Sequence, residues 1–113
     1  MSRVSNAALK QLPDAARVFA ALGDPTRLRL VSRLSADGPQ SITALTAGAG
    51  VTRQAITKHL MALGDAGLAT PARQGRQIVW SLETRRLDIA RRHLDFVSGQ
   101  WDQALDRLKH FVE

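Results

Sequence analysis

The chain has 113 residues, of which 44% are hydrophobic, and it carries a formal net charge of +6 at pH 7. This length suits one compact domain with a modest core and is too short to argue for two. The positive charge attracts anionic partners, a class that includes DNA, RNA, acidic proteins and membrane surfaces, without choosing among them. The sequence has no cysteine, which excludes disulfides, thiolate metal sites and cysteine nucleophiles.

The charge is distributed unevenly along the chain. Residues 53–92 hold eight Lys or Arg against three acids, whereas residues 93–113 hold two against four. We therefore expect the anionic partner to meet the middle of the chain and the last segment to have another role. No apolar run approaches the roughly 18 residues of a membrane span, and residues 1–14 lack the apolar centre of a signal peptide. These features predict a cytoplasmic protein.

Apolar spacing and helix breakers predict two helices in the first third of the chain. The first covers residues 12–22 and ends at Gly23. The second begins with Asp24 as its N-cap and Pro25 in its first turn, and it stops at the Asp-Gly-Pro sequence of residues 37–39. In the first helix the apolar residues that recur at helical spacing are Leu12, Ala15, Phe19 and Leu22, and the expected buried stripe of the second is Leu28, Val31 and Leu34.

Two shorter helices follow. Ser41 caps one that runs to the Gly-Ala-Gly sequence at residues 48–50, and Thr52 caps one within residues 51–63, which Gly64 and Gly67 close. Two short helices joined by a tight turn with glycine are typical of a helix-turn-helix. Their expected inner faces are Ile42 and Leu45 in the first, and Ile56, Leu60 and Leu63 in the second.

After Gly67 the pattern changes to short extended runs, which predict a β-hairpin of residues 68–73 and 77–82. Its loop is residues 74–76, so Arg73 and Arg76 place two guanidinium groups at the tip. The apolar side of the second strand alternates with Val79 and Ser81 and consists of Ile78, Trp80 and Leu82.

Residues 84–113 predict one long helix whose only breaker is Gly99. Apolar residues recur along it in alternating steps of three and four, which is a heptad seam: Leu87, Ala90, Leu94, Val97, Trp101, Ala104, Leu108 and Phe111. Such a helix is too long for a small domain to cover, so we expect a partner chain on the seam. The expected dimer interface is Leu12, Phe19, Leu94, Val97, Trp101, Leu105, Leu108 and Phe111.

Residues 16–82 resemble the ArsR family of bacterial winged-helix transcriptional repressors. The resemblance rests on the sequence ALGDPTRLRLV at residues 21–31, on the His-Leu pair at residues 59–60 and on the Arg-x-Gly-Arg wing at residues 73–76. It implies a mainly α winged helix-turn-helix with a small β-hairpin, in which residues 1–113 form a single DNA-binding domain and 84–113 a C-terminal dimerisation helix. It also implies a homodimer that represses transcription by binding a palindromic operator in double-stranded DNA and is released by an inducer, here unknown.

In this framework the polar face of residues 51–63 is predicted to enter the DNA major groove. Arg and Gln make bidentate contacts to guanine and adenine edges, and Thr meets a base or a thymine methyl, whereas Lys suits phosphate. The candidate DNA-binding residues are Ser41, Thr43, Thr52, Arg53, Gln54, Thr57, Lys58, His59, Arg73 and Arg76.

Less specific explanations exist for the same residues. The polar face of residues 51–63 resembles an ordinary solvated helix face, His59 suits a contact inside the domain as well as a phosphate, and a basic hairpin tip improves solubility. Four further arginines fit either of two roles: they border the DNA surface, or they solvate the outer face of the dimerisation helix. We leave them out of the site: Arg85, Arg86, Arg91 and Arg92.

Metal sensing is a common activity in the ArsR family, but the residues here do not match its ligand patterns. Without cysteine there is no Cys-x-Cys site, and Ala90 stands where an Asp-x-His motif starting at Asp88 needs histidine. His110 and Glu113 keep a His-x-x-Glu spacing, which we interpret as two polar residues at the protein surface. We therefore predict no metal site and no cofactor; a metal-sensing repressor of the same fold is the alternative.

The sequence offers little for catalysis. The Gly-Ala-Gly at residues 48–50 has Arg53 where a dinucleotide-binding loop needs its third glycine, and no expected strand precedes it. No serine sits in a nucleophile elbow. We therefore expect a protein that is not an enzyme, and a winged-helix module that binds a protein partner is the remaining alternative.

Overall fold

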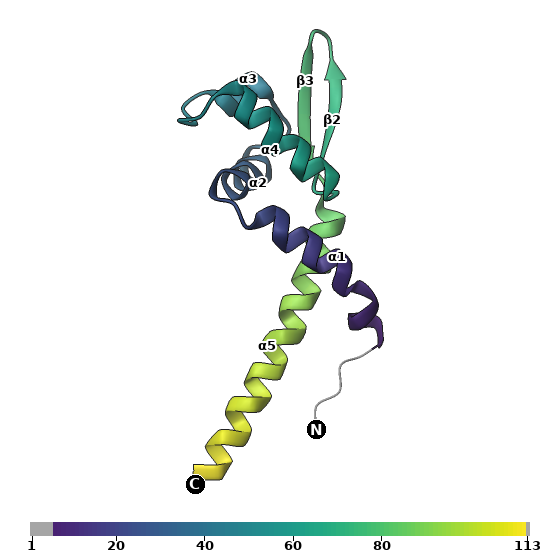
Figure 1. Ribbon diagram of the computed structural model, residues 1–113, viewed down its shortest axis with the longest axis vertical. Helices are drawn as coiled ribbons and strands as arrows, with labels where there is room; N and C mark the ends of the chain where they lie inside the picture. The colour runs from purple at the N-terminus through teal and green to yellow at the C-terminus, as the bar shows by residue number, and fades with distance from the viewer. Residues whose placement is uncertain (1–5, 113) are drawn as a thin grey trace.

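The computed structural model describes residues 6–112, with side chains for residues 10–111. The fold is mainly helical with a small antiparallel sheet, as predicted (Figure 1). Helices α2 to α4 and the hairpin lie at one end of a molecule of 64 × 28 × 20 Å, and α5 extends to the other end, with α1 crossing it near its start. The elements are α1 (Asn6–Leu22), α2 (Pro25–Asp37), β1 (Gln40–Ser41), α3 (Ile42–Thr46), α4 (Arg53–Asp65), β2 (Ala69–Gln74), β3 (Gln77–Leu82) and α5 (Thr84–Val112).

Helix α1 begins six residues before the predicted start and contains Pro13. Proline lacks one backbone N–H, so the helix forgoes one hydrogen bond there without ending. At the other end, Gly23 follows the last helical residue as predicted. The side chain of Arg27 donates to the carbonyl oxygens of Ala21 (2.6 Å) and Ala20 (3.4 Å). The Ala20 carbonyl also accepts from the Gly23 backbone N–H at 3.3 Å, so Arg27 and Gly23 together satisfy carbonyls at the C-terminus of α1.

Helix α2 starts as predicted, because the Asp24 carboxylate accepts a hydrogen bond from the Arg27 backbone N–H at 3.0 Å. The predicted buried face was partly wrong. Leu30 is buried in place of Leu28, which is 51% exposed. Two residues are about 200° apart around a helix, so these two leucines cannot share one face, and the core lies on the side of Leu30.

The sheet contains one strand that the sequence did not predict. Strand β1 pairs antiparallel with β3, so the strand order is β1-β3-β2. The hairpin is as expected, but Gln74 pairs with Gln77, which shortens its turn to Gly75 and Arg76. Gly75 has a φ of 63°, which suits the first position of such a turn.

The predicted alternation on β3 was also wrong. Val79 and Trp80 are both buried, whereas Ile78 is half exposed. Val79 and Trp80 lie where β3 is flanked by β1 on one side and by β2 on the other, while the outer half of the hairpin projects past α4 (Figure 1). Burial along β3 is therefore greatest where three strands lie side by side, and it does not follow the two-residue period of a strand.

The core lies between α1, α2, α4 and the base of the sheet. The three residues predicted for the inner face of α4 are completely buried, which confirms the helical period of that segment. The largest fully buried side chains are Val18, Leu45, Ile56, Leu60, Leu63 and Leu68.

Helix α5 divides into two parts. Ala90 is buried in the core and Leu87 packs against it, so the first turns lie within the chain's own fold, where the seam had been expected to meet a partner. From Leu94 onward the large apolar side chains are mostly exposed, and Trp101 and Phe111 reach 64% and 85%. Within the described residues no helix is long and apolar enough to cross a bilayer.

The packing of α4 gives a matched pair of stability variants. Leu60→Ala removes a fully buried side chain and is expected to lower the free energy of unfolding by about 2–5 kcal/mol. Met61→Ala changes its exposed neighbour and is expected to stay within about 0.5 kcal/mol of wild type. Urea denaturation at one protein concentration measures both, and equal losses would contradict this packing.

The start of α4 gives a second stability prediction. The Thr52 hydroxyl accepts a hydrogen bond from the Ala55 backbone N–H at 3.1 Å. Thr52→Ala removes this cap and is expected to cost about 1 kcal/mol, whereas Thr52→Ser keeps the hydroxyl and most of the stability. Urea denaturation compares the three proteins, and an alanine variant as stable as the serine variant would show that the cap contributes nothing.

Candidate nucleic-acid interface

Helices α3 and α4 and the turn between them form one rigid unit. Ser41 caps α3 by accepting from the Ala44 backbone N–H at 3.1 Å, as Thr52 does for α4. In both hydroxyls the oxygen is used by the cap, and the hydrogen stays available for donation to an outside acceptor. Gly48 and Gly50 in the turn have φ values of 70° and 73°, a conformation that residues with a side chain rarely adopt.

Two arginines of α2, which the sequence analysis did not single out, donate hydrogen bonds to the backbone of α3 and of the turn after it. Arg33 donates to the carbonyl oxygens of Ala44 (3.2 Å) and Leu45 (3.3 Å), and Arg29 donates to that of Ala49 at 3.4 Å. These bonds satisfy carbonyls at the end of α3 and in the turn. The spacing of charges on α2 carries no sign of this role, because the acceptors are backbone atoms of another element.

The outward face of α4 carries Arg53, Gln54 and Lys58, all exposed. Arg53 donates from Nη1 to the hydroxyl of Thr43 on α3 at 2.9 Å. The half-buried Thr57 donates its hydroxyl to the Arg53 carbonyl oxygen at 2.9 Å. The structure thus brings together candidates from both helices, and it holds the guanidinium group of Arg53 over the start of α3.

His59 lies on the side of α4 that faces α2. Its Nδ1 is 3.7 Å from Oδ2 of Asp24, and the two side chains are 25% and 32% exposed. The hydrogen bond from the Arg27 backbone N–H is the main cause that holds the pKa of Asp24 below its ordinary value. Partial desolvation opposes it, and the nearby Arg27 guanidinium and the His59 ring, when protonated, lower the pKa further. The stability that Asp24 contributes is therefore present above the ordinary carboxyl pKa and is lost as the pH falls through the lowered one.

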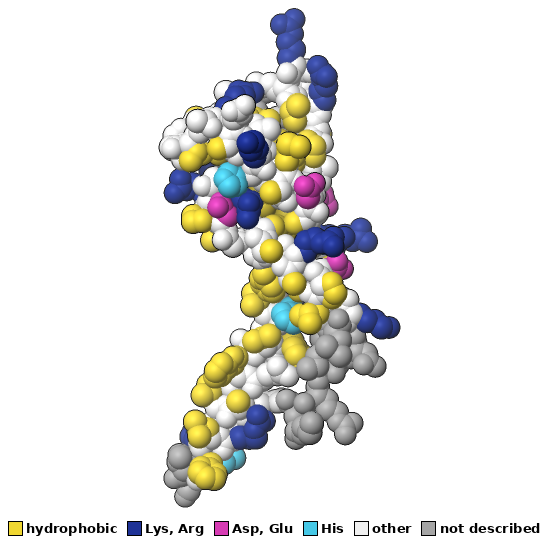
Figure 2. All heavy atoms as spheres, in the orientation of Figure 1, with side chains coloured by type: hydrophobic (Ala, Val, Ile, Leu, Met, Phe, Trp, Pro, Cys, Tyr) yellow, Lys and Arg dark blue, Asp and Glu magenta, His cyan; other side chains and the backbone are white. Residues whose placement is uncertain are grey.

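The two candidate arginines of the wing are exposed on the hairpin. Arg73 lies on β2 and its Nε donates to the Gly75 carbonyl oxygen at 3.4 Å, and Arg76 lies in the turn. The hairpin projects at the same end as α3 and α4 (Figure 1). Figure 2 shows basic side chains at its tip and over the neighbouring helices. This end of the molecule therefore offers a projecting, electropositive surface to an anionic partner.

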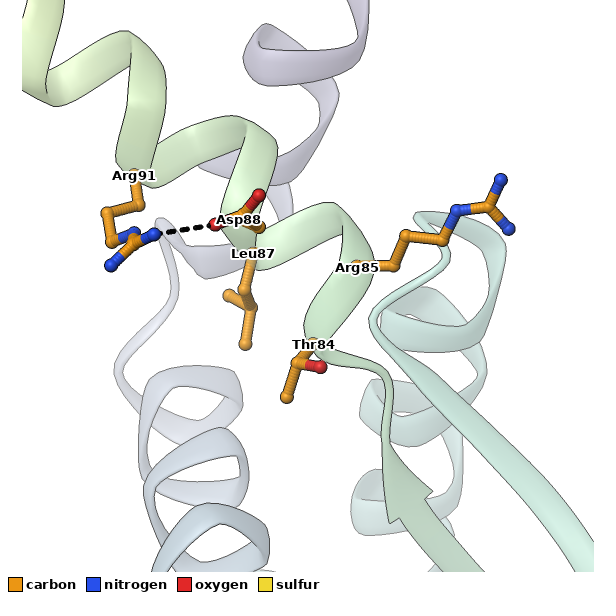
Figure 3. Close-up of a pocket in the computed structure, with 5 residues that line it drawn as sticks. All are labelled: Thr84, Arg85, Leu87, Asp88 and Arg91. Atoms are coloured by element: carbon orange, nitrogen blue, oxygen red, sulfur yellow. Dashed lines mark hydrogen bonds and ion pairs between the residues drawn. The ribbon is translucent and has the colours of Figure 1, made fainter.

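Three of the four arginines at the start of α5, which we left out of the site, have partners within the protein. Arg86 pairs with Asp14 of α1 at 2.9 Å, and Arg91 and Arg92 both pair with Asp88. The hydrogen bond from Arg92 is the main cause that lowers the pKa of Asp88. Figure 3 shows the Asp88–Arg91 pair and Arg85, which extends away from that pair; with Thr84 and Leu87 these residues line a shallow cavity of about 480 Å³.

The histidines do not gather into a metal site. Across the part of the chain that the structure describes, no three His, Asp or Glu side chains are placed to hold an ion. The ring centroid of His93 is 6.2 Å from that of Phe19 and 6.5 Å from that of Phe96. The Nε2 atom of His110 is 3.8 Å from Oδ2 of Asp106. Glu113, the other member of the His-x-x-Glu spacing, lies outside the described residues.

Comparison with known proteins agrees with this geometry. Residues 22–71 match the family model for a helix-turn-helix domain. The chain is 35% identical over 101 residues to the HTH-type transcriptional regulator Rv2034 of Mycobacterium tuberculosis, a match that covers 89% of each protein.

Solved structures extend the likeness to almost the whole fold. An ArsR-like transcriptional regulator from Rhodococcus sp. RHA1 is similar with a TM-score of 0.76 and 35% identity, over 92% of this chain and 97% of that one. A homodimeric winged helix-turn-helix domain from Mycobacterium bovis, described as a possible ArsR-family regulator, has a TM-score of 0.63 and 26% identity, over 91% and 92%. The helix-turn-helix with its basic wing, and the long final helix beside it, are thus those of a DNA-binding regulator, and the chain belongs to the ArsR family of helix-turn-helix transcriptional regulators.

Proposed function

We propose that this regulator is a cytoplasmic homodimeric repressor that binds a palindromic operator and is released by a signal. Residues 1–113 act as a single winged helix-turn-helix domain, with residues 84–113 as its dimerisation helix. The observation that carries the proposal is the exposed polar face of α4, which lies at the same projecting end as the basic wing. An α-helix fits the major groove of B-DNA, and a hairpin beside it reaches the adjacent backbone.

Three residues of α4 are proposed to read bases. Arg53 and Gln54 are exposed in the first turn of the helix, where a recognition helix meets base edges, and both side chains can bond bidentately to a purine. The Thr57 hydroxyl already donates its hydrogen to the Arg53 carbonyl oxygen. Its oxygen can still accept from a base, and its methyl group suits contact with a thymine methyl.

The remaining candidates are proposed to meet the sugar-phosphate backbone or the minor groove. The exposed ammonium of Lys58 and the hydroxyls of α3 and of the α4 cap donate to phosphate without reading sequence. The wing arginines suit flanking phosphates or a narrow minor groove, where the negative potential is strong. His59 acts at the edge of this surface, close to α2. This phosphate and minor-groove set is Ser41, Thr43, Thr52, Lys58, His59, Arg73 and Arg76.

The dimer is proposed to form through the exposed apolar row of α5 together with α1. Trp101 and Phe111 lie on the part of α5 that extends beyond the core and are among the most exposed apolar side chains of the described residues. Burial of such side chains contributes about 25 cal/mol per Å² of apolar surface. The homodimeric relative from Mycobacterium bovis supports this assembly. The proposed interface residues are Leu12, Phe19, Leu94, Val97, Trp101, Leu105, Leu108 and Phe111.

Base reading and phosphate binding can be separated experimentally. Gln54→Ala is expected to cost about 1–3 kcal/mol for each lost base contact and to relax the preference at one position of each half-site. Lys58→Ala is expected to weaken binding to all sequences alike and to reduce the salt slope by about one unit for each phosphate contact. Affinities for single-base operator variants at several salt concentrations measure both effects. If Gln54→Ala weakens every sequence equally, α4 does not read the groove.

The dimer interface is tested by charge placed in the apolar row. Trp101→Glu is expected to give a monomer in analytical ultracentrifugation, because a buried carboxylate in an apolar interface is strongly unfavourable. Gln103→Glu adds the same charge two residues further along α5, about 200° around the helix, and should leave the dimer intact. A dimeric Trp101→Glu protein would show that the interface lies elsewhere.

A further inference from the structure

The helix-turn-helix meets the proposed dimerisation helix at a junction where α1 and the start of α5 pack on the common core. We call α2, α3, α4 and the sheet the reading head, and α1 and α5 the dimer helices. Figure 1 shows α1 crossing α5 near its start, where the reading head ends. At this junction the Glu83 backbone N–H donates to the Leu68 carbonyl oxygen at 2.8 Å, and Val18 and Ala90 enter the common core.

One side chain of α5 contacts both α1 and the turn that follows α4. Arg86, in the first turn of α5, pairs through Nη1 with Oδ1 of Asp14 on α1 at 2.9 Å. Its Cγ and Nε also lie 3.1 and 3.2 Å from the point that a Cβ atom on Gly67 would occupy. Gly67 stands between α4 and β2 with a φ of 76°. The stem of Arg86 therefore lies across the turn that ends the proposed recognition helix, while its charged end is fixed to α1.

The ion pair itself contributes little to stability. Its two side chains are 38% and 44% exposed, and exposed pairs are worth about 0–1 kcal/mol. The pairs of Asp88 with Arg91 and Arg92 join residues of one helix, whereas the Asp14–Arg86 pair bridges two helices and contacts the reading head. Its distinctive consequence is geometric, because it restrains how the reading head is oriented on the dimer helices.

We propose that Arg86 is a positioning residue for DNA recognition: by joining Asp14 to the Gly67 turn, it sets the half-site spacing that the dimer accepts. The inference rests on the proposed function, since it requires a dimer on a two-fold operator. One base pair corresponds to about 3.4 Å of rise and about 35° of rotation. In a symmetric dimer each change at the junction occurs twice, so a small change in angle shifts one recognition helix relative to the other by a distance of that order.

The test measures spacing preference and not only affinity. The wild-type protein first selects a palindromic duplex from a randomised pool, and the central spacer is then shortened or lengthened by one base pair. Dissociation constants are measured on the three duplexes and on one half-site for wild type, Arg86→Ala, Asp14→Asn and Arg86→Lys. Arg85→Ala is the matched control, because it removes the same charge from the adjacent residue, which lines the same cavity as Asp14 and Arg86 but forms no ion pair among the described residues.

Wild type and Arg85→Ala are expected to prefer the selected spacing by about tenfold, and Arg86→Ala and Asp14→Asn by no more than about threefold. Arg86→Lys, which keeps the charge and the stem, should recover part of the preference. Half-site affinity and the dimeric state in analytical ultracentrifugation should stay at wild-type values, because none of the changed residues belongs to the proposed DNA-binding set or dimer interface. Asp14→Asn gives the same test from the other side of the pair if Arg86→Ala does not fold.

Two results would overturn the inference alone: a wild-type spacing profile in both Arg86→Ala and Asp14→Asn, or an equal loss of preference in Arg85→Ala. A wild-type protein that selects no palindromic duplex, or that is monomeric, would overturn the proposed function and this inference with it.

Discussion

The one-sided packing of α4 is the constraint on which the rest of the reading head depends. Ile56, Leu60 and Leu63 are completely buried, and they are separated by steps of four and three, so one stripe of the helix holds it in the core. The opposite stripe, with Gln54 and Lys58, is left free to meet a partner. Had the helix been buried on both sides, its polar side chains would need hydrogen-bond partners inside the protein and could not contact the bases of DNA.

Precise positioning of that free face comes from polar contacts that carry little of the stability. Hydroxyl caps fix where α3 and α4 begin, and Arg33 of α2 satisfies carbonyls at the end of α3. Arg53 donates a hydrogen bond to the hydroxyl of Thr43. Hydrogen bonds of this kind add about 1 kcal/mol each, far less than the apolar core. Their value lies in direction, because base recognition depends on donors and acceptors held in a defined geometry.

The sequence predicted well what is decided locally and poorly what depends on distant contacts. Asp24, Ser41 and Thr52 act as the predicted caps, and the stripe of α4 follows from its period alone. Strand β1 has two residues and no period, and Ile78 is exposed because the hairpin leaves the core there. Of the candidate site, the exposed faces of α4 and the wing could be located from sequence. The arginine contacts beneath α3 and the Asp14–Arg86 pair could not, because their partners are backbone atoms or residues far along the chain.

In the proposed dimer, helix α5 links dimerisation to recognition through the apolar surface that it leaves exposed. The apolar side chains from Leu94 to Phe111 extend past the core of a single chain. In a monomer they would be exposed to water, which is unfavourable in free energy, and a dimer would bury them. A single reading head offers only a few base contacts together with salt-sensitive phosphate contacts, which bind DNA weakly. Joining two heads makes the second contact intramolecular and raises the effective concentration. Operator affinity should therefore depend on protein concentration through the dimer, and a signal that alters either the α5 interface or the orientation of the heads upon it would be felt at both half-sites together.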